Sequence, residues 1–415
     1  MVKEWEREKI GNLLDFKNGL NKGKQFFGYG TPIVNYTDVY KKRGLKKEDI
    51  KGKVSLDDSE ISRYAVKKGD VFFTRTSETP EEVGIASVML EDIPDCAFSG
   101  FVLRGRPKTD RLIPEYCKYC FSTEEVRREI ITRCTYTTRA LTNGKQLSAI
   151  DIPVPEKKEQ ELIASALFDI DELIDCLDQL ITKKKSVRQG AIQRLIENKV
   201  QLAGFSLKWD YLPFEDCFDL LPNNTLSRAN LNYSDGIIRN IHYGDLLTKF
   251  HSVLQCDKEN LPFINREKTS QLSPVTLRDG DFVMADTAED ETVGKISEVI
   301  NVGNKQIVAG LHTIACRPKR KEMFAPMWIG YYMDSPAYHK QLLPFITGIK
   351  VSSIARKDLS QTVIAVPEKK EQEKIVEILF SMDNEINSLV IELDKYKRLR
   401  DGMLDQLLTG KIRLV

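Results

Sequence analysis

The eight residues VPEKKEQE at Val154–Glu161 occur a second time, letter for letter, at Val366–Glu373. An exact repeat of this length within a chain of 415 residues indicates an internal duplication. The flanking residues agree, because IPVPEKKEQELIASALFDIDELI in the first copy aligns with IAVPEKKEQEKIVEILFSMDNEI in the second. The fold is therefore expected to consist of two related halves.

The similarity continues upstream of the repeated phrase with small gaps. Lys67–Phe73 (KKGDVFF) aligns with Arg278–Met284 (RDGDFVM), and Trp5 and Trp209 open the two copies. Between these anchor points the copies share almost nothing, so two units keep one scaffold and differ in surface. The expected segments are a first globular domain, a central helix, a second globular domain and a C-terminal helix: residues 1–153, 154–203, 204–365 and 366–415.

Each copy of the phrase is typical of the start of a long amphipathic helix. Pro155 and Pro367 suit the first helical position, and Glu156 and Glu368 then lie at the positive end of the helix dipole. Apolar residues follow at alternating spacings of four and three, which is the pattern of a coiled-coil seam. The predicted seam residues are Ile163, Leu167, Ile170, Ile174, Leu177 and Ile181 in the first copy, and Ile375, Leu379, Met382, Ile386, Leu389, Leu393 and Tyr396 in the second.

Each helix is expected to run for about 40 residues, or roughly 60 Å. A helix of that length cannot bury its apolar stripe alone. A core helix of a large domain is one interpretation. The length and the identical twin favour an antiparallel coiled coil of the two helices, with a globular domain at each end. The expected fold class is α+β with pseudo-twofold symmetry.

The two globular domains are expected to mix strands and helices. Gly69–Arg75, Val83–Leu90 and Phe98–Pro107 are apolar or β-branched runs bounded by turn residues, which predicts strands. Ile113–Arg133 follows as a predicted helix. The second domain repeats this order and ends in a predicted helix from Ala325 to about Gln341.

Two basic, hydroxyl-rich loops follow these helices and lead back to the coil, at Arg133–Ser148 and Thr347–Ser360. Arginine and lysine neutralise phosphates or bond the guanine edge, and hydroxyls reach phosphates and base edges. Tyr136 could stack against a base, although a buried tyrosine is the alternative. The predicted DNA-contacting residues are Arg75, Thr76, Ser77, Arg133, Thr135, Tyr136, Thr137, Arg139 and Lys145 in the first domain, and Asp286, Thr287, Lys350, Ser352, Ser353 and Arg356 in the second.

Charge supports this hypothesis unevenly. Residues 1–153 carry an excess of Lys and Arg, whereas residues 204–365 are nearly balanced, so positive potential there must be local, as at Arg317–Lys321. A formal net charge of +1 excludes binding by charge alone, so either affinity is modest or partners contribute. A solvated connection is the competing interpretation of each loop.

The composition indicates a globular chain of a reducing compartment. No stretch approaches the roughly 18 uninterrupted apolar residues of a membrane span, and the N-terminus is charged rather than apolar. Eight scattered cysteines fit the cytoplasm, and no membrane partner is expected. Cys117 and Cys120, with Cys134 further on, have a suggestive spacing, but all four histidines lie in the other half, so no metal site is expected.

No catalytic motif is present in the sequence. It lacks a phosphate-binding GxxxxGK[ST] loop, a dinucleotide fingerprint and the Asn/Asp-Pro-Pro-Tyr tetrapeptide that holds a flipped adenine. Asp151 followed by Glu156 and Lys158 resembles a magnesium-binding nuclease pattern, but the second copy has no acid before Glu368. We therefore expect no catalytic residue in this chain.

The order of the segments is the most informative feature. A variable domain precedes a helix with Pro-x-x-x-Glu-Gln (Pro155–Gln160), and a second variable domain precedes a second such helix that ends in LTGKI (Leu408–Ile412). VKKGD (Val66–Asp70) belongs to the same pattern. This order resembles the specificity subunit of a type I DNA restriction–modification system, and the resemblance covers essentially the whole chain.

The resemblance implies a role in double-stranded DNA recognition. Each variable domain would be a target-recognition domain that reads one half of a split site, with the half-sites about one helical turn (~34 Å) apart. The helices would set this distance and dock two methyltransferase subunits, which bring S-adenosylmethionine. Restriction subunits with translocase and nuclease activity would bring ATP and magnesium, and no cofactor is expected in this chain.

Two other interpretations stay open. A DNA-targeting scaffold of a methylation-only or other phage-defence complex would share every feature of this sequence. A coiled-coil adaptor without a DNA role belongs to a different class, and the divergent, hydroxyl-rich loops on a duplicated frame argue against it.

Overall fold

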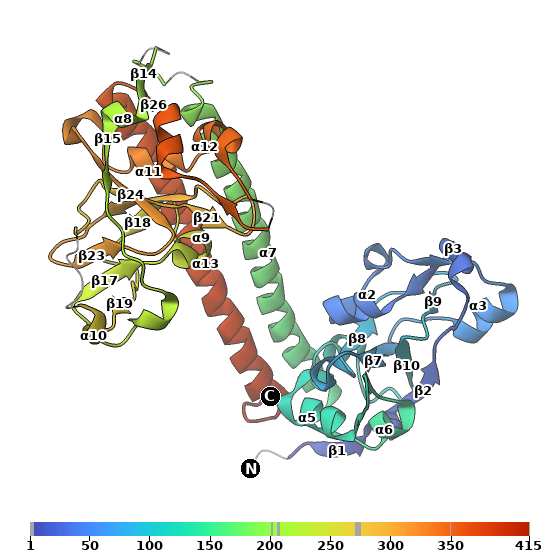
Figure 1. The fold of residues 1–415 in the computed structure, drawn as a ribbon. Coiled ribbons are helices and arrows are strands. Elements are labelled where there is room, and N and C mark those ends of the chain that lie inside the picture. The colour runs from blue at the N-terminus through green and yellow to red at the C-terminus, as the bar shows by residue number, and fades with distance from the viewer. Residues whose placement is uncertain (1–3, 201, 206–207, 270–274, 349, 415) are drawn as a thin grey trace. The chain divides into compact units, whose positions relative to one another are not determined.

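The computed structural model shows two compact units. Unit 1 comprises Met1–Gln179 and Ile391–Val415, and unit 2 comprises Leu180–Val390. Each unit holds one globular domain and a segment of each long helix (Figure 1). The residues that the structure describes are 4–200, 202–205, 208–269, 275–348 and 350–414.

A five-stranded sheet forms the centre of each globular domain. Its strand order is β2-β10-β6-β8-β4 in unit 1 and β15-β24-β20-β22-β18 in unit 2. In both sheets the first four strands are antiparallel and the last pair is parallel. The duplication is therefore present in the topology. The strands are Leu14–Asn18 (β2), Val102–Pro107 (β10), Val71–Thr74 (β6), Ala86–Met89 (β8) and Gly44–Leu45 (β4), and Phe218–Leu221 (β15), Thr313–Pro318 (β24), Phe282–Ala285 (β20), Ile296–Ile300 (β22) and Val253–Gln255 (β18).

Smaller sheets and short helices surround each central sheet. The strands are Phe27–Val34 (β3), Lys53–Val54 (β5) and Ala97–Phe98 (β9) in unit 1, and Leu231–Asn232 (β16), Ile238–Ile241 (β17), Phe263–Ile264 (β19) and Gln306–Ala309 (β23) in unit 2. The helices are Ile10–Leu13 (α1), Tyr36–Lys41 (α2), Asp58–Tyr64 (α3) and Gly144–Ser148 (α6), and Phe214–Cys217 (α8), Tyr243–Thr248 (α9) and Arg266–Thr269 (α10).

The central strands β6 and β20 are buried along their whole length. This is expected for an apolar run in the middle of a sheet that is covered on both faces. The turn before β6 places Gly69 at a φ of 87°, which favours glycine, and Asp70 closes it by accepting the Lys67 N–H at 2.8 Å. Asp70 also binds Arg106 of β10 at 2.7 Å, so one buried carboxylate ties two strands together.

A two-stranded antiparallel ribbon connects each domain to its long helix. In unit 1, Glu6–Lys9 (β1) pairs with Asp151–Val154 (β13), and in unit 2, Asp210–Pro213 (β14) pairs with Val363–Val366 (β26). The helices that follow are 40 residues each: Lys157–Ile196 (α7) and Lys369–Leu408 (α13). The ribbons bring the N-terminal strand of each copy to the start of its helix.

The two helices begin two residues later than the sequence predicted. The Gln160 N–H donates to the Glu156 carbonyl at 3.0 Å, so Glu156 is the N-cap and the prediction that Pro155 occupies the first helical position is wrong. The reason is a side chain, because the Gln160 amide donates to the Pro155 carbonyl at 2.9 Å and holds it outside the helix. Gln372 makes the same bond to Pro367 at 2.9 Å.

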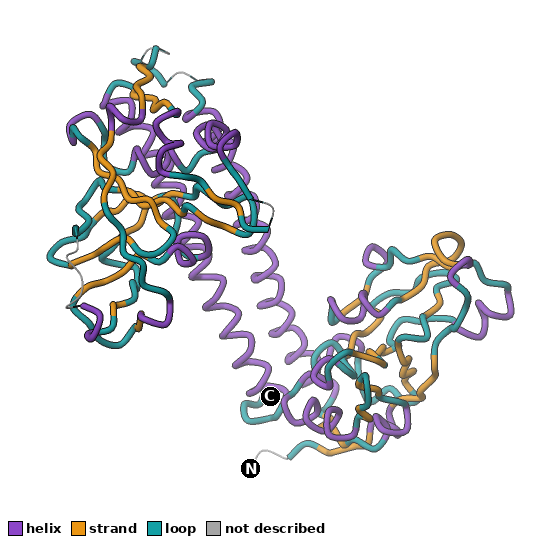
Figure 2. Tube along the Cα trace, in the orientation of Figure 1, coloured by secondary structure: helices purple, strands orange, loops and turns teal. Residues whose placement is uncertain are grey.

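The two long helices lie side by side and run antiparallel within each unit (Figure 1). In unit 1, Ile163 of α7 belongs to the same buried cluster as Leu408 of α13. In unit 2, Leu379 of α13 belongs to a cluster with Ile196 of α7. Figure 2 shows α7 and α13 as helical throughout, with the strands confined to the globular domains.

The structure buries most of the predicted seam. All six seam residues of α7 are buried, and Ile375, Leu379, Ile386 and Leu393 of α13 are buried as well. The remaining α13 residues, Met382, Leu389 and Tyr396, are half-buried.

Each predicted helix that precedes one of the two basic, hydroxyl-rich loops is divided into two helices in the structure. Thr123 Oγ1 accepts the Val126 N–H at 3.3 Å, and Ser335 Oγ accepts the Tyr338 N–H at 3.4 Å. These capping residues have extended backbone, so a single helix over Ile113–Arg133 or Ala325–Gln341 is wrong. The observed helices are Pro114–Cys117 (α4) and Glu124–Arg133 (α5) in unit 1, and Trp328–Met333 (α11) and Pro336–Leu342 (α12) in unit 2.

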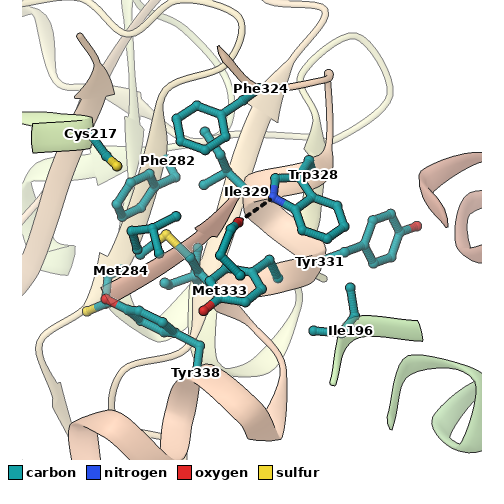
Figure 3. Packing of buried hydrophobic residues seen from close by; sticks show 14 of the residues in the cluster. Ile196, Cys217, Phe282, Met284, Phe324, Trp328, Ile329, Tyr331, Met333 and Tyr338 are labelled. Carbon is teal, nitrogen blue, oxygen red and sulfur yellow. Dashed lines mark hydrogen bonds between the residues drawn. The ribbon is translucent and has the colours of Figure 1, made fainter. Parts of the chain in front are cut away.

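An aromatic core joins the sheet of unit 2 to its helices. Trp328 lies in the middle of this core with no exposed surface, and its Nε1 donates to the Ala365 carbonyl at 3.3 Å (Figure 3). The Trp209 ring meets Trp328 edge to face at 5.7 Å between centroids. Large buried rings contribute much of the stability of such a core, because each one removes a large apolar area from water. The globular domain is thereby fixed on the helices by tight packing.

Candidate nucleic-acid interface

A small three-stranded sheet in unit 1 brings two of the predicted DNA-contacting segments together. The strands are Thr76–Ser77 (β7), Thr135–Tyr136 (β11) and Ala140–Leu141 (β12), in the order β11-β12-β7. Leu141 pairs with Thr76, and the Thr142 N–H donates to the Arg75 carbonyl at 3.0 Å. We call this sheet the reader sheet of unit 1.

Unit 2 contains the equivalent arrangement. Thr287–Ala288 (β21) pairs with Ser352–Ser353 (β25), and the Ile354 N–H donates to the Asp286 carbonyl at 2.9 Å. Ile354 lies 212 positions after Thr142, the interval of the repeated phrase, so the backbone contact is duplicated. We call this pair the reader sheet of unit 2. The backbone frame is shared, and the side chains on it differ.

Several side chains on and beside the unit 1 reader sheet are exposed. Tyr136 is 57% exposed, which argues against the alternative of a core tyrosine. Arg139 forms an ion pair with Glu78 at 2.9 Å, and both groups face solvent. Arg133 pairs with Glu129 on α5 at 2.8 Å. Exposed pairs of this kind contribute little stability, so a phosphate can replace the carboxylate at low cost.

Not every predicted residue presents a free group. Ser77 is buried, and its hydroxyl donates to Glu82 at 2.7 Å. Arg75 is half-buried, and its guanidinium donates to the Gly100 carbonyl at 3.3 Å. Both residues therefore support the frame of the reader sheet. The other predicted residues of unit 1 are exposed or half-buried: Thr76, Thr135, Thr137 and Lys145, which lies on α6.

The predicted residues of unit 2 divide in a similar way. Thr287 donates its hydroxyl to Asp286 at 2.7 Å, and Arg356 donates to the Asn223 side chain. Lys350 is exposed, and Ser352 and Ser353 are half-buried. The carboxylate of Asp286 stands where unit 1 has Arg75, so the two reader sheets carry opposite charges at the same position of the frame.

One residue beside each reader sheet was missed by the sequence interpretation. The carbonyl of Phe101 accepts the Arg75 N–H at 3.0 Å, and the carbonyl of His312 accepts the Asp286 N–H at 3.1 Å. Phe101 is 64% exposed. Each residue lies in the turn before β10 or β24, where a single aromatic residue leaves no periodic signal. Arg106-Pro107 and Arg317-Pro318 align between the two copies and follow these turns, but the sequence interpretation did not extend that alignment to the residues before it.

His312 belongs to a cluster of rings in unit 2. The Tyr243 ring lies 5.3 Å from His312 and 4.7 Å from His242, between centroids. Burial and the nearby Arg228 lower the pKa of His242, and its Nδ1 accepts the Gly244 N–H at 3.1 Å. His242 is therefore neutral and structural. His312 and Tyr243 extend the surface beside the reader sheet with hydrogen-bonding aromatic groups.

Among the described residues, no group of three or more His, Cys, Asp or Glu side chains is arranged to hold a metal ion. Cys117, the last residue of α4, and Cys120 are both buried. Of the nuclease-like pattern, Asp151 lies on β13 and Glu156 is the N-cap of α7.

This architecture defines a class of protein with two related α+β domains and two long antiparallel helices, of which each unit contains a segment. The family model of the type I restriction modification DNA specificity domain matches residues 2–184 and 238–393. The chain therefore belongs to this family. The fold class that the sequence predicted is confirmed.

Curated relatives agree with this assignment. The chain is 22% identical over 438 residues to a Methanocaldococcus jannaschii protein assigned as the MjaX specificity subunit of a type I restriction enzyme, covering 99% of this chain and 94% of that one. It is 25% identical over 172 residues to the EcoKI specificity subunit of Escherichia coli, covering 41% of this chain and 36% of that one.

Solved structures show the same fold. The S subunit of a type I restriction–modification system from M. genitalium matches 97% of this chain and 96% of its own length, with a TM-score of 0.55 and 15% identity. A chain from a study of complex assembly and conformational transition in a type I system matches with a TM-score of 0.56, 15% identity, and coverage of 99% and 98%. None of the described helices combines the length and apolar character that a membrane span requires.

Proposed function

We propose that this chain is the sequence-specific DNA-recognition subunit of a type I restriction–modification complex. The observation that carries the proposal is the duplicated reader sheet, in which one backbone frame presents different side chains in unit 1 and unit 2. Membership of the DNA specificity family supports it. The target is then split and asymmetric, with residues 1–153 reading one half and residues 204–365 the other.

The exposed groups of the reader sheets supply the chemistry of base and phosphate contact. Arg139 can exchange its exposed Glu78 partner for a phosphate or for the edge of a guanine. Tyr136 and Phe101 present exposed rings that can stack on a base or wedge between base steps. In unit 2, Lys350 and the ring of His312 are exposed beside the reader sheet, so the second half-site is read by a different set.

The proposal includes partners for this chain. The two long helices dock two methyltransferase subunits that bind S-adenosylmethionine and methylate adenine. Restriction subunits add translocation and cleavage with ATP and magnesium. This chain recognises the target sequence. Co-purification from cells that carry the whole system tests which of these subunits are present. Methyltransferase subunits alone would favour the scaffold of a methylation-only complex.

A domain exchange tests the two-part reading most directly. Methylome sequencing of cells with the intact system identifies the methylated target. Replacing residues 1–153 with the same region of a relative is then expected to change one half of that target and leave the other half intact. A simultaneous change in both halves would show that the domains do not read independently. Absence of DNA binding in a mobility-shift assay of the complex would favour the adaptor interpretation.

A single substitution tests the reader sheet itself. Arg139→Ala is expected to weaken binding of the cognate duplex by about 1–3 kcal/mol and relax one target position if Arg139 reads a base. If it contacts only phosphate, binding weakens evenly on all duplexes and the salt dependence becomes shallower. Arg398→Ala on α13 is a matched control, since Arg398 is exposed and pairs with Asp394 outside the reader sheets. Cognate binding equal to wild type in Arg139→Ala would place recognition elsewhere in residues 1–153.

A further inference from the structure

A set of three polar residues at the junction of domain and helices occurs twice in the chain. The unit 1 set is Tyr119, Asp171 and Arg400, and the unit 2 set is Tyr331, Asp383 and Arg188. Each member lies 212 positions from its counterpart, the interval of the repeated phrase. We call these sets the junction triads. Each triad joins three segments: the globular domain, α7 and α13.

The unit 2 triad is closed. The Tyr331 hydroxyl on α11 donates to Asp383 Oδ2 on α13 at 2.7 Å. The Arg188 guanidinium on α7 meets both oxygens of the same carboxylate, with Nη2 to Oδ2 at 3.1 Å. Figure 3 shows the Tyr331 ring at the edge of the aromatic core with its hydroxyl directed away from that core. The carboxylate is therefore shared between the domain and the opposite helix.

The unit 1 triad has the same members in a looser arrangement. The Tyr119 hydroxyl donates to Asp171 Oδ2 at 3.0 Å. Arg400 Nη1 lies 3.9 Å from Asp171 Oδ1, and its Nη2 binds the neighbouring Asp401 at 2.9 Å. Since the Arg400 guanidinium makes its hydrogen bonds to Asp401 and only approaches Asp171, the connection from domain to opposite helix is weaker in unit 1.

Packing alone does not require these hydroxyl groups. Tyr119 and Tyr331 are each 1% exposed, so their rings fill the core, and phenylalanine would fill the same space. A hydrogen bond to a carboxylate is directional, whereas apolar contact is not, so the hydroxyl fixes the angle of the domain on its helices. The two copies have diverged across most of their surface, and yet all six members of the triads are retained.

We propose that the junction triads are positioning residues that set the angle of each target-recognition domain on its helix pair, and through it the spacer length that the protein accepts between its half-sites. The proposal rests on the proposed function of the chain. It assigns no contact with DNA to the triads. Their effect on DNA is expected to depend on spacer length and not on the bases of either half-site.

Tyr331→Phe tests the proposal in the complex with its methyltransferase subunits. Binding is measured on duplexes that carry the methylome-defined target with the native spacer and with spacers one base pair longer and shorter. We expect the preference for the native spacer to fall about fivefold, because one hydrogen bond is lost. Tyr119→Phe is expected to have a smaller effect because its triad is looser. Asp383→Asn, which breaks the same triad from the α13 side, is expected to act like Tyr331→Phe.

Tyr332→Phe is the matched control. Tyr332 is also a buried tyrosine of α11, but its hydroxyl donates at 3.3 Å to the Val363 carbonyl, away from the two helices. If Tyr331→Phe lowers affinity equally on all three spacers, the triad is only a stabilising contact and the proposal is overturned. A fall in spacer preference in Tyr332→Phe as large as that in Tyr331→Phe would overturn it too. An unchanged spacer preference in Tyr331→Phe would overturn it as well. Failure of the wild-type complex to bind the split target would instead refute the proposed function.

Discussion

Two glutamates at the starts of the long helices make the clearest comparison between the units. Glu159 and Glu371 occupy the same place in the repeated phrase, are 4% and 3% exposed, and each accepts a tryptophan Nε1–H, from Trp5 at 2.9 Å and from Trp209 at 3.1 Å. Among the residues that the structure describes, a cation contacts only Glu159 of this pair, since Arg413 binds both of its oxygens at 2.6 and 2.7 Å.

The pKa values of these two glutamates shift in opposite directions. Burial raises the pKa of Glu159, but the hydrogen bonds from Arg413 and Trp5 lower it by more, so the pKa lies below its ordinary value. Burial raises the pKa of Glu371, and Trp209 offsets this only in part. A duplicated residue therefore keeps its place in the scaffold, while the direction of its pKa shift depends on which other segment contacts it.

The largest effect is expected from a charge in the coiled-coil seam. Ile170→Asp places a carboxylate at a position that is 7% exposed, and we expect a loss of about 3 kcal/mol or more of unfolding free energy, seen as insoluble protein or loss of methyltransferase binding. Met382→Asp is the equivalent change in unit 2 and should cost less, because Met382 is half-buried. Wild-type stability and assembly of Ile170→Asp, checked by urea unfolding and co-purification, would refute the seam.

A second difference between the units is a buried carboxylate that only unit 2 has. Glu298 on β22 is 1% exposed and accepts the N–H groups of Met327 and Gly330 at 2.7 and 2.8 Å, whereas unit 1 has Val88 at the equivalent strand position. Burial raises the pKa of Glu298 to about 7.

Glu298 should make unit 2 less stable as pH rises. A raised pKa means that folding favours the protonated form, so its contribution is full below the unfolded pKa and is lost as pH rises through about 7. We expect unit 2 to lose about 3 kcal/mol between pH 4.5 and 8 from this group. Glu298→Gln should remove that slope in urea unfolding followed by Trp328 fluorescence. An unchanged slope would contradict the assignment.

The comparison of the two helix-start glutamates can be tested with one substitution in each copy. Glu159→Gln is expected to lower the unfolding free energy by about 1–2 kcal/mol at pH 7, because a depressed pKa stabilises the fold above the unfolded pKa and this contribution is lost in acid. Glu371→Gln is expected to raise it at pH 7, because a raised pKa contributes only at low pH. Urea unfolding at pH 7 and pH 4 measures both, and effects of equal sign at pH 7 would contradict the comparison.

The smallest effect is expected from the exposed residues beside the reader sheets. Phe101→Ala should weaken DNA binding by about 0.5–1.5 kcal/mol through loss of a stacking contact, and its melting temperature should stay that of wild type because the ring is 64% exposed. His312→Ala should act on the other half-site. Affinities on duplexes mutated in one half at a time separate the two. Phe101→Ala with full affinity for the cognate target would remove Phe101 from the interface.

The long helices and the central strands were predictable because their residues are periodic and occur in two copies. The seam from Ile163 to Ile181 and the strands at Val71–Thr74 and Phe282–Ala285 follow from spacing and apolar content. The boundaries were less predictable. The break before α5 depends on the Thr123 cap, and the late start of α7 depends on the Gln160 side chain reaching the Pro155 carbonyl, neither of which has a periodic signature.

The sequence by itself determined the duplication, the two long helices, the class of fold and the segments that form the reader sheets. Tertiary structure decided which residues of those segments face solvent. Ser77 and Tyr136 both belong to predicted reading segments, yet one is buried against Glu82 and the other is 57% exposed. The tertiary structure also placed Phe101 and His312 beside the reader sheets and Arg413 against Glu159. These residues act through partners that are distant along the chain, and a local pattern carries no information about contacts that only folding creates.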